Sequence, residues 1–307
     1  MLTATGDGVP TGTEFMASTR DIRRRIKSVK NTAQITKAMQ MVAASKMRKA
    51  QQAALAGRPY ALMLNKVLAE VAASALDFTH PLFEVREVKQ RGVILVTTDK
   101  GLCGSLNTNI LREVAKFDAA TTTFIAAGRK GSQFLARTKR RLAADFSYKD
   151  IPSFAEARAI VKFAIDLFLQ GELDQVDILF TNFINTLSQK PSILPLLPVG
   201  ELRATVAGVH GEERQESLVK GATEFLFEPS AAQVLGALVP HHLNFGMYQV
   251  LLEAKASEHS ARMVAMKNAT ENAQQLIKDL TLEYNKIRQA SITKEILEIS
   301  SAAMTAA

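Results

Sequence analysis

The chain has 307 residues and a formal net charge of +8, and 47% of its residues are hydrophobic, with no Trp. This length and composition are typical of a folded protein with one large or two smaller domains, and they exclude a disordered chain. A single cysteine, Cys103, excludes an intrachain disulfide and a cysteine-rich zinc site. The low cysteine content favours a reducing compartment.

The N-terminus, MLTATGDGVPTGTEF, has neither the basic nor the apolar segment of a targeting peptide. We interpret residues 1–17 as a disordered extension, and the sequence MASTRDI favours Met16 as an alternative start. The longest apolar segment, AAQVLGALVPHHLNFGMYQVLL, is interrupted by Pro240 and by polar residues. We therefore expect no direct membrane span.

Residues 18–76 are predicted to form one long helix, because they are rich in Ala, Met, Lys, Arg and Gln, which favour helices. Either Ser18 or Thr19 can cap its start. Steps of four, three and four residues predict a coiled-coil seam formed by Ile22, Ile26, Val29 and Ala33. After Ile35 the apolar residues spread over more of the helix, which predicts that the strict register is lost there.

Charge is concentrated in this first helix. Residues 18–58 contain eleven basic residues and one acidic residue, a net charge of +10, so the rest of the chain sums to −2. Such a positive helix could bind nucleic-acid phosphates or an acidic protein surface, and the alternative is that the charges only face solvent. The segment has no aromatic residue before Tyr60 and no nucleic-acid-binding motif, which disfavours nucleic acid.

The middle of the chain alternates between two patterns. Short β-branched or apolar segments predict strands at 91–99, 121–127, 141–148 and 174–183. Helical segments lie between them at about 106–117, 129–139 and 153–169. This alternation predicts a Rossmann-like α/β domain with a mainly parallel sheet. Further strands are expected at PSILPLLPVG and TEFLFEP, with the exposed loop GVHGEERQES between them.

The C-terminal part, from Pro229, returns to a helical pattern, with a kink expected at Pro240. A heptad seam is predicted at His259, Met263, Met266, Thr270, Ala273, Ile277, Leu280, Tyr284 and Ile287. A helix over residues 242–303 would be ~93 Å long at ~1.5 Å per residue, so it must pair with another long helix. The predicted fold is a long antiparallel coiled coil of the N- and C-terminal helices with an inserted α/β domain.

These patterns divide the chain into four predicted segments: an extension at 1–17, an N-terminal coiled-coil helix at 18–76, a central α/β domain at 77–229 and a C-terminal coiled-coil helix at 230–307. The last turns of the C-terminal helix, SITKEILEIS, are expected to extend beyond the N-terminal helix. Nothing else in the chain is predicted to cover them.

Few segments suggest chemistry. The loop TTDKGLCGSLN lies between a predicted strand and helix, as phosphate-binding loops do, but its glycine spacing matches no nucleotide-binding motif. A tight turn explains Gly101 and Gly104 better, and a buried hydrophobic role explains Cys103 better than a nucleophile. No metal-binding or hydrolase motif occurs, and we expect no catalytic residues, no metal and no cofactor.

Three segments carry a family resemblance. The run STRDIRRRIKSVKNTAQITKAMQMVAASKMRKAQ resembles the N-terminal helix of the gamma subunit of F-type ATP synthases. The loop TTDKGLCGSLN is similar to a loop of that family's central domain, and the segment from SEHSARM to ITKEILEI resembles its C-terminal signature. The similarity covers Ser18 to the end of the chain. Chloroplast members have a pair of regulatory cysteines that is missing here.

The resemblance implies a central rotor shaft without catalytic residues of its own. Its implied partners are three alpha and three beta subunits, the epsilon subunit and the membrane c-ring, and no nucleic acid. The implied location is the cytoplasmic face of the bacterial plasma membrane, as a peripheral protein. The alternatives are a basic coiled-coil adaptor for nucleic acid or protein, and an enzyme that uses the α/β domain to bind a nucleotide.

The resemblance also implies contacts with the head formed by the alpha and beta subunits. The face bearing Lys37, Met39 and Lys46 is expected to run close to an acidic segment of the beta subunits. Polar contacts of the upper shaft are expected at Arg262, Gln289, Thr293 and Glu295. The alternative is an apolar bearing made by Ile292, Ile296 and Ile299.

Overall fold

The computed structural model describes residues 19–74, 80–199, 228 and 230–305. The predicted extension at 1–17, the strand expected at TEFLFEP and the loop GVHGEERQES lie outside these residues, except for Glu228. The chain divides into two units. The smaller unit contains residues 1–37 and 268–307, and the larger contains residues 38–267.

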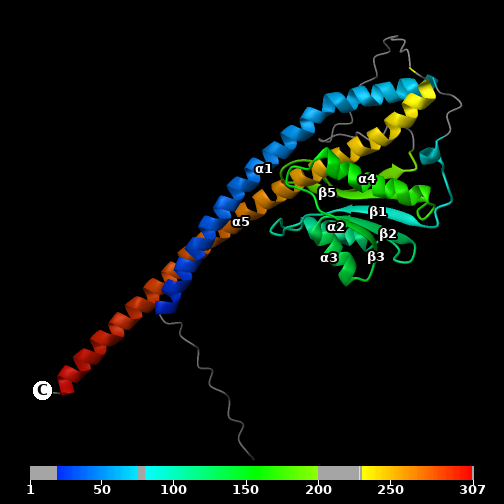
Figure 1. Ribbon diagram of the computed structural model, residues 1–307. Helices are drawn as coiled ribbons and strands as arrows, with labels where there is room; N and C mark the ends of the chain where they lie inside the picture. The colour runs from blue at the N-terminus through cyan, green and yellow to red at the C-terminus, as the bar shows by residue number, and fades with distance from the viewer. Residues whose placement is uncertain (1–18, 75–79, 200–227, 229, 306–307) are drawn as a thin grey trace, which may run out of the picture. The chain divides into compact units, whose positions relative to one another are not determined.

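Each unit contains part of two long helices. Helix α1 spans Thr19–Ser74 and contains Pro59, and helix α5 spans Ala231–Thr305 and contains Pro240 (Figure 1). Helix α5 continues through Pro240, where a kink was expected. A proline removes only one helical hydrogen bond, and the neighbouring Val239 and Leu243 are buried in the core, which offsets that loss.

The smaller unit is an antiparallel helix pair. The hydroxyl groups of Thr36 and Thr270 lie 2.7 Å apart, and Arg23 donates a hydrogen bond to the hydroxyl of Tyr284. Residue numbers therefore increase along one helix while they decrease along the other. On the α5 side of this unit, the predicted seam is confirmed, because its positions are buried or half-buried. These positions are Thr270, Ala273, Ile277, Leu280, Tyr284 and Ile287.

In the larger unit, the prediction that α1 loses its register was wrong. Buried residues continue at steps of three, four or seven residues along α1, at Ala43, Met47, Ala50, Ala54, Ala61, Leu64, Leu68 and Val71. Small residues hold many of these positions, so they do not stand out by hydrophobicity. The apolar Val42, which suggested a broader contact, is exposed.

Small residues bring the two helices of the larger unit close together. A Cβ atom on Gly57 of α1 would lie 2.1 Å from Nε2 of Gln249 and 3.3 Å from Cζ of Phe245, both on α5. Ala54 clusters with Leu252 in the same contact. A larger side chain at position 57 would therefore have to displace the side chain of Gln249.

The inserted domain is built on a five-stranded sheet in the order β3-β2-β1-β4-β5 (Figure 1). Its strands are β1 (Arg91–Val96), β2 (Thr122–Ala127), β3 (Arg141–Phe146), β4 (Gln175–Phe183) and β5 (Gln189–Leu197). All neighbouring pairs are parallel except β4 and β5. The predicted Rossmann-like domain is therefore confirmed, with one antiparallel edge strand.

Helices cover both faces of the sheet. Its helices are α2 (Leu106–Val114), α3 (Arg129–Arg137) and α4 (Phe154–Leu169), and the short 3-10 helix η1 (Pro81–Phe83) precedes β1. Helices α2 and α3 pack on one face around Val93, Leu95 and Phe124. On the other face, α4 and the nearby parts of α1 and α5 pack around Ile94, Ile125 and Phe168. Strand β1 is buried on both faces, which explains its uninterrupted apolar sequence.

We predict that Gly128→Ala destabilises the larger unit far more than Gly171→Ala. Both glycines have positive φ, at 110° and 76°, so both substitutions bring backbone strain of roughly 1–2 kcal/mol. Only at Gly128 would the new Cβ also collide with backbone, 2.2 Å from the carbonyl oxygen of Thr97. Urea unfolding should show a loss of more than about 3 kcal/mol for Gly128→Ala. Equal losses for the two variants would contradict this packing.

Candidate functional site

The carboxyl ends of β1 and β4 mark the place where doubly wound folds usually bind ligands. From β1 the chain moves outward to β2 and β3, then returns through α4 to β4 on the other side of β1. Such a switch in strand order leaves a crevice at the carboxyl ends of the strands. Here α5 occupies that position. Ser257 donates to the carbonyl oxygen of Thr181 at 3.0 Å, and Ser260 donates to that of Thr186 at 2.9 Å.

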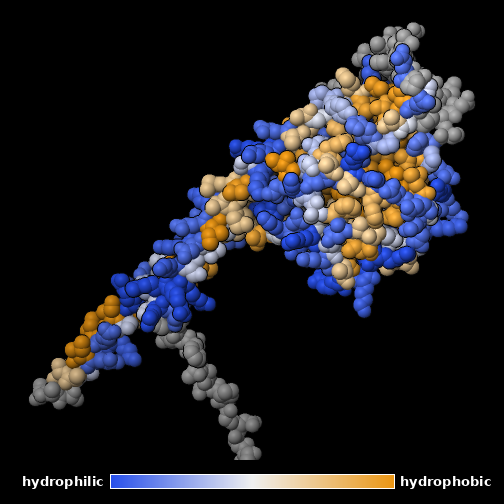
Figure 2. Space-filling model, viewed as in Figure 1, coloured by the Kyte–Doolittle hydropathy of each residue, from blue (hydrophilic) through white to orange (hydrophobic). Residues whose placement is uncertain are grey.

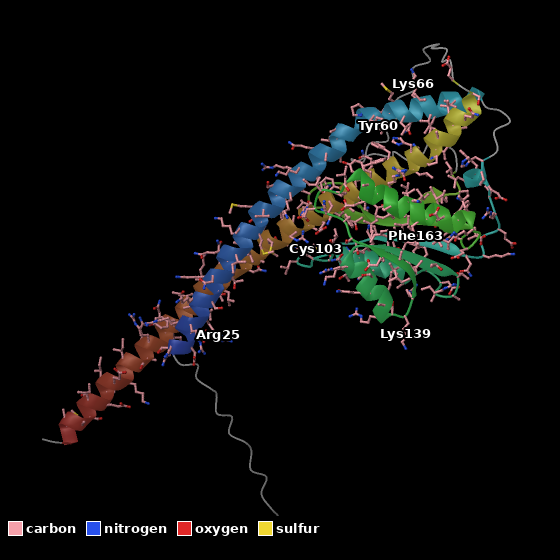
Figure 3. The ribbon with its side chains drawn as sticks, in the orientation of Figure 1. Arg25, Tyr60, Lys66, Cys103, Lys139 and Phe163 are labelled. Atoms are coloured by element: carbon pink, nitrogen blue, oxygen red, sulfur yellow. The ribbon has the colours of Figure 1, made fainter. Side chains whose placement is uncertain are left out.

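The loop between β1 and α2 contains the glycine-rich sequence noted above. Gly104 has a φ of 60°, which confirms that the turn requires glycine there. The same explanation was wrong for Gly101, because its φ is not positive and a Cβ would contact nothing. Leu102 takes the second left-handed position, with a φ of 62°. Cys103 is buried, as expected, and burial raises the pKa of its thiol (Figure 3).

Arg262 of α5 holds this loop against the helix. Its guanidinium donates to the carbonyl oxygens of Gly101, at 3.2 Å from Nη2, and Lys100, at 3.3 Å. Nη2 also lies 2.8 Å from Oε1 of Glu258. The side chain of Arg262 is only 11% exposed. This predicted partner-contact residue therefore makes strong contacts within its own chain.

The predicted contact residues of α1 lie in different surroundings. Lys37, in the smaller unit, is exposed. In the larger unit, Met39 is half-buried, and Lys46 forms an ion pair with Asp150 of the segment between β3 and α4. The hydrogen bond from Lys46 is the main reason that the pKa of Asp150 is lowered. Met39 and Lys46 are seven residues apart, so they share one side of α1.

The end of α5 is exposed on all sides. Gln289 and Thr293 are exposed, and Glu295, also exposed, accepts a hydrogen bond from Ser291 at 3.4 Å. All described residues from Arg288 to Met304 are exposed. They include large apolar side chains at Ile292, Ile296, Leu297 and Ile299, and Figure 2 shows apolar residues gathered near this end of the helix. Polar and apolar candidates thus lie on one uncovered segment.

Sequence reasoning missed a set of buried charged residues around Glu258. Lys255 Nζ lies 3.0 Å from Oε2 of Glu258, and the two side chains are 2% and 4% exposed. His259, next in sequence, is also buried. The spacing of Lys255, Glu258 and Arg262 is that of ion pairs on one helix face, and this signal could have revealed the ion pairs but not their burial.

His259, a position of the predicted heptad seam, is buried beside charged groups. Its Nδ1 lies 3.3 Å from Nη1 of Arg262, and its Nε2 lies 3.9 Å from Oδ1 of Asp150. Burial is the main reason that the pKa of His259 falls to about 4, and the nearby cations Arg262 and Lys255 add to this, against the opposing effect of Glu258 and Asp150. Among the described residues, no group of His, Cys, Asp and Glu side chains could hold a metal ion.

No helix among the described residues is long and apolar enough to cross a membrane.

The fold and its exposed helical surfaces define a class of protein, an α/β domain inserted between two long paired helices. A family model described as ATP synthase matches residues 18–305. The ATP synthase gamma chain of Opitutus terrae is 51% identical over 294 residues, which are 95% of this chain and 100% of that protein. The chain therefore belongs to the ATP synthase gamma chain family.

Solved structures agree with this fold. A chain of the Euglena gracilis mitochondrial ATP synthase has a TM-score of 0.66 and 21% identity, and the match covers 94% of each chain. A chain from the central stalk and c-ring of the Tetrahymena thermophila mitochondrial ATP synthase has a TM-score of 0.57 and 26% identity. That match covers 76% of this chain and 99% of the other.

We predict that the protein loses stability as the pH falls from about 6.5 to about 4, and that His259→Gln removes part of this loss. The pKa of His259 is lowered to about 4 in the folded protein, so between these pH values the unfolded chain binds a proton that the folded chain does not. Stability from this group is thus complete above about 6.5, and up to about 3 kcal/mol is lost toward pH 4. Urea unfolding at pH 7 and pH 4.5 measures this difference. The same pH dependence in both proteins would contradict it.

Proposed function

We propose that this chain is the central rotor shaft of an F-type ATP synthase. In this role it couples ion flow through a membrane c-ring to ATP synthesis or hydrolysis at a head of three alpha and three beta subunits, with the epsilon subunit beside it. It would act at the cytoplasmic face of the bacterial plasma membrane as a peripheral protein without a cofactor. Membership of the gamma chain family and the Tetrahymena central-stalk match support this proposal.

The exposed end of α5 is the observation that carries the proposal. Ile296 is 60% exposed and Ile299 is 70% exposed, on a helix that no other described part of the chain covers there. Adjacent exposed apolar side chains mark a surface that binds a partner. A bearing in the head would bury them.

The proposed division of labour follows the segments of the chain. Residues 18–76 and 230–307 form the coiled-coil shaft, residues 77–229 form the domain that meets epsilon and the c-ring, and residues 1–17 are an extension. We assign Lys37, Met39 and Lys46 to the contact with the acidic segment of the beta subunits. We assign Gln289, Thr293 and Glu295 to polar contacts of the upper shaft. Arg262, expected among them, uses its donors within its own chain, and we propose no partner contact for it.

The proposed mechanism depends on asymmetry. A single shaft presents different side chains to three chemically identical catalytic sites at any moment. Each site is therefore stabilised in a different conformation, and rotation of the shaft changes which site binds, closes or releases nucleotide. The shaft biases these equilibria and needs no reacting group of its own.

Purification of the tagged chain from its own membranes tests the proposal. We expect one copy with three alpha and three beta subunits, measured by native mass spectrometry. The chain alone should hydrolyse no ATP, because α5 fills the crevice where the α/β domain would bind a nucleotide. Purification with nucleic acid and without these subunits would contradict the proposal, and so would ATP turnover that substitutions in the α/β domain abolish.

We predict that the polar residues near the end of α5 contribute to coupling. Gln289→Ala and Thr293→Ala should lower ATP-driven proton pumping more than ATP hydrolysis, because each removes a hydrogen-bonding group that the head contacts. At merely solvated positions, such changes alter stability by no more than about 0.5 kcal/mol and leave coupling intact.

Gln275→Ala supplies an exposed polar control on the same helix, outside the segment from Arg288 onward. The measurement is the ratio of pumping to hydrolysis in reconstituted vesicles. If Ile296→Ala and Ile299→Ala uncouple the complex while both polar variants behave like the wild type, the bearing is apolar and the polar assignment is wrong.

A further inference from the structure

We propose that the buried ionic cluster centred on Glu258 is a torsional joint that fixes the orientation of α5 on the α/β domain. In this proposal, Lys255 and Glu258 are positioning residues for the transfer of torque. The inference rests on the proposed rotor function. It names the contact, within the larger unit, through which torque would be transmitted between α5 and the α/β domain.

Glu258 lies between two cations of its own helix. Its Oε2 is 3.0 Å from Nζ of Lys255, and its Oε1 is 2.8 Å from Nη2 of Arg262. Both carboxylate oxygens therefore accept charge-assisted hydrogen bonds, which are roughly twice as strong as neutral ones. All three side chains are largely or fully buried.

The two cations carry the contact into the α/β domain. Arg262 donates to the backbone carbonyls of Lys100 and Gly101 in the β1–α2 loop. Nζ of Lys255 lies 4.4 Å from the ring centroid of Tyr148, in the segment between β3 and α4. The Tyr148 hydroxyl in turn donates to the carbonyl oxygen of Thr97 at 2.9 Å. The carboxylate of Glu258 thus orients two cations, and these contact two separate segments at the carboxyl edge of the sheet.

A second set of contacts extends the joint around the helix. Ser257 and Ser260 bind the carbonyl oxygens of Thr181, in β4, and Thr186, in the β4–β5 turn. His259 faces Asp150, which pairs with Lys46 of α1. Every residue from Leu251 to Ser260 is buried, so α5 is enclosed on all sides here. This is the one described stretch of α5 longer than three residues in which every residue is buried.

These contacts differ from ordinary core packing because hydrogen bonds and ion pairs depend on the direction in which the groups face. Buried ion pairs contribute little net stability compared with apolar residues of the same shape, so stability alone does not explain them. Apolar side chains attract without a preferred direction, and helices packed only by them can slide or turn by small steps. Rotation of α5 about its axis would instead pull the charged donors of Arg262 away from fixed carbonyl oxygens in a buried region.

Reconstituted ATP synthase containing this chain allows a direct test. Glu258→Gln keeps the shape and removes the charge. A second variant, Lys255→Met with Glu258→Leu and Arg262→Met, replaces all three charges by apolar groups and so leaves no unpaired buried charge. The control is Glu113→Gln, which removes the carboxylate of the ion pair with Lys116 on the surface of the same domain.

The readouts are torsional stiffness in single-molecule rotation and the ratio of proton pumping to ATP hydrolysis. We expect stiffness to fall by about twofold in Glu258→Gln, because the amide has one acceptor oxygen for the two cations, and by at least as much in the triple variant, which keeps none of these hydrogen bonds. The pumping ratio should fall with it, and the control should match the wild type. Thermal unfolding of the triple variant should stay close to that of the wild type.

Three outcomes would refute the proposed torsional joint. Wild-type stiffness and coupling in the triple variant would show that packing alone holds the helix. Failure of the triple variant to assemble would show that the cluster serves folding, and equal losses in the Glu113→Gln control would show a general effect of charge. A wild-type complex that neither rotates nor pumps would instead refute the proposed rotor function, so the two failures are distinguishable.

Discussion

The burial of Glu258 between Lys255 and Arg262 is the interaction on which the contact between α5 and the inserted domain depends. A carboxylate with 4% exposure is stable only if both of its oxygens are satisfied, and here the same helix supplies both cations. Those cations bind the loops at the carboxyl ends of the strands. Helix α5 therefore occupies the position that a cofactor takes in other doubly wound folds. The domain keeps the architecture of a nucleotide-binding fold and uses it to hold a helix.

The helix pairing depends on a second constraint, the small side chains of the α1 seam. Alanine and glycine at Ala50, Ala54 and Gly57 let α1 approach α5 closely. The α5 half of the seam was predictable because large residues such as Leu280 and Tyr284 mark it. The α1 half beyond Ile35 was not, because a buried alanine and an exposed alanine read alike in a sequence. Only the packing partner tells them apart.

The strands and the domain helices followed from local pattern, since an apolar run such as that of β1 is typical of a strand buried on both faces. The buried charges did not follow from it. Lys255 and Glu258 have the spacing of a solvated pair on a helix, and the sequence alone gives no sign that Tyr148 and the loop carbonyls close over them. Likewise, Arg262 was assigned to an outside partner, whereas its donors bind Glu258 and the loop after β1.

Under the proposed function, the two kinds of surface on α5 meet opposite demands. The joint at Glu258 must not move, and its contacts are directional, buried and charge-assisted. The exposed end from Arg288 onward must turn inside a bearing and pass each of three sites alike. Apolar side chains such as Ile296 and Ile299 suit that task, because attraction between apolar surfaces has little dependence on angle. A polar contact there would add preferred stopping positions, so the balance between Gln289 or Thr293 and the isoleucines sets how strongly the shaft pauses as it turns.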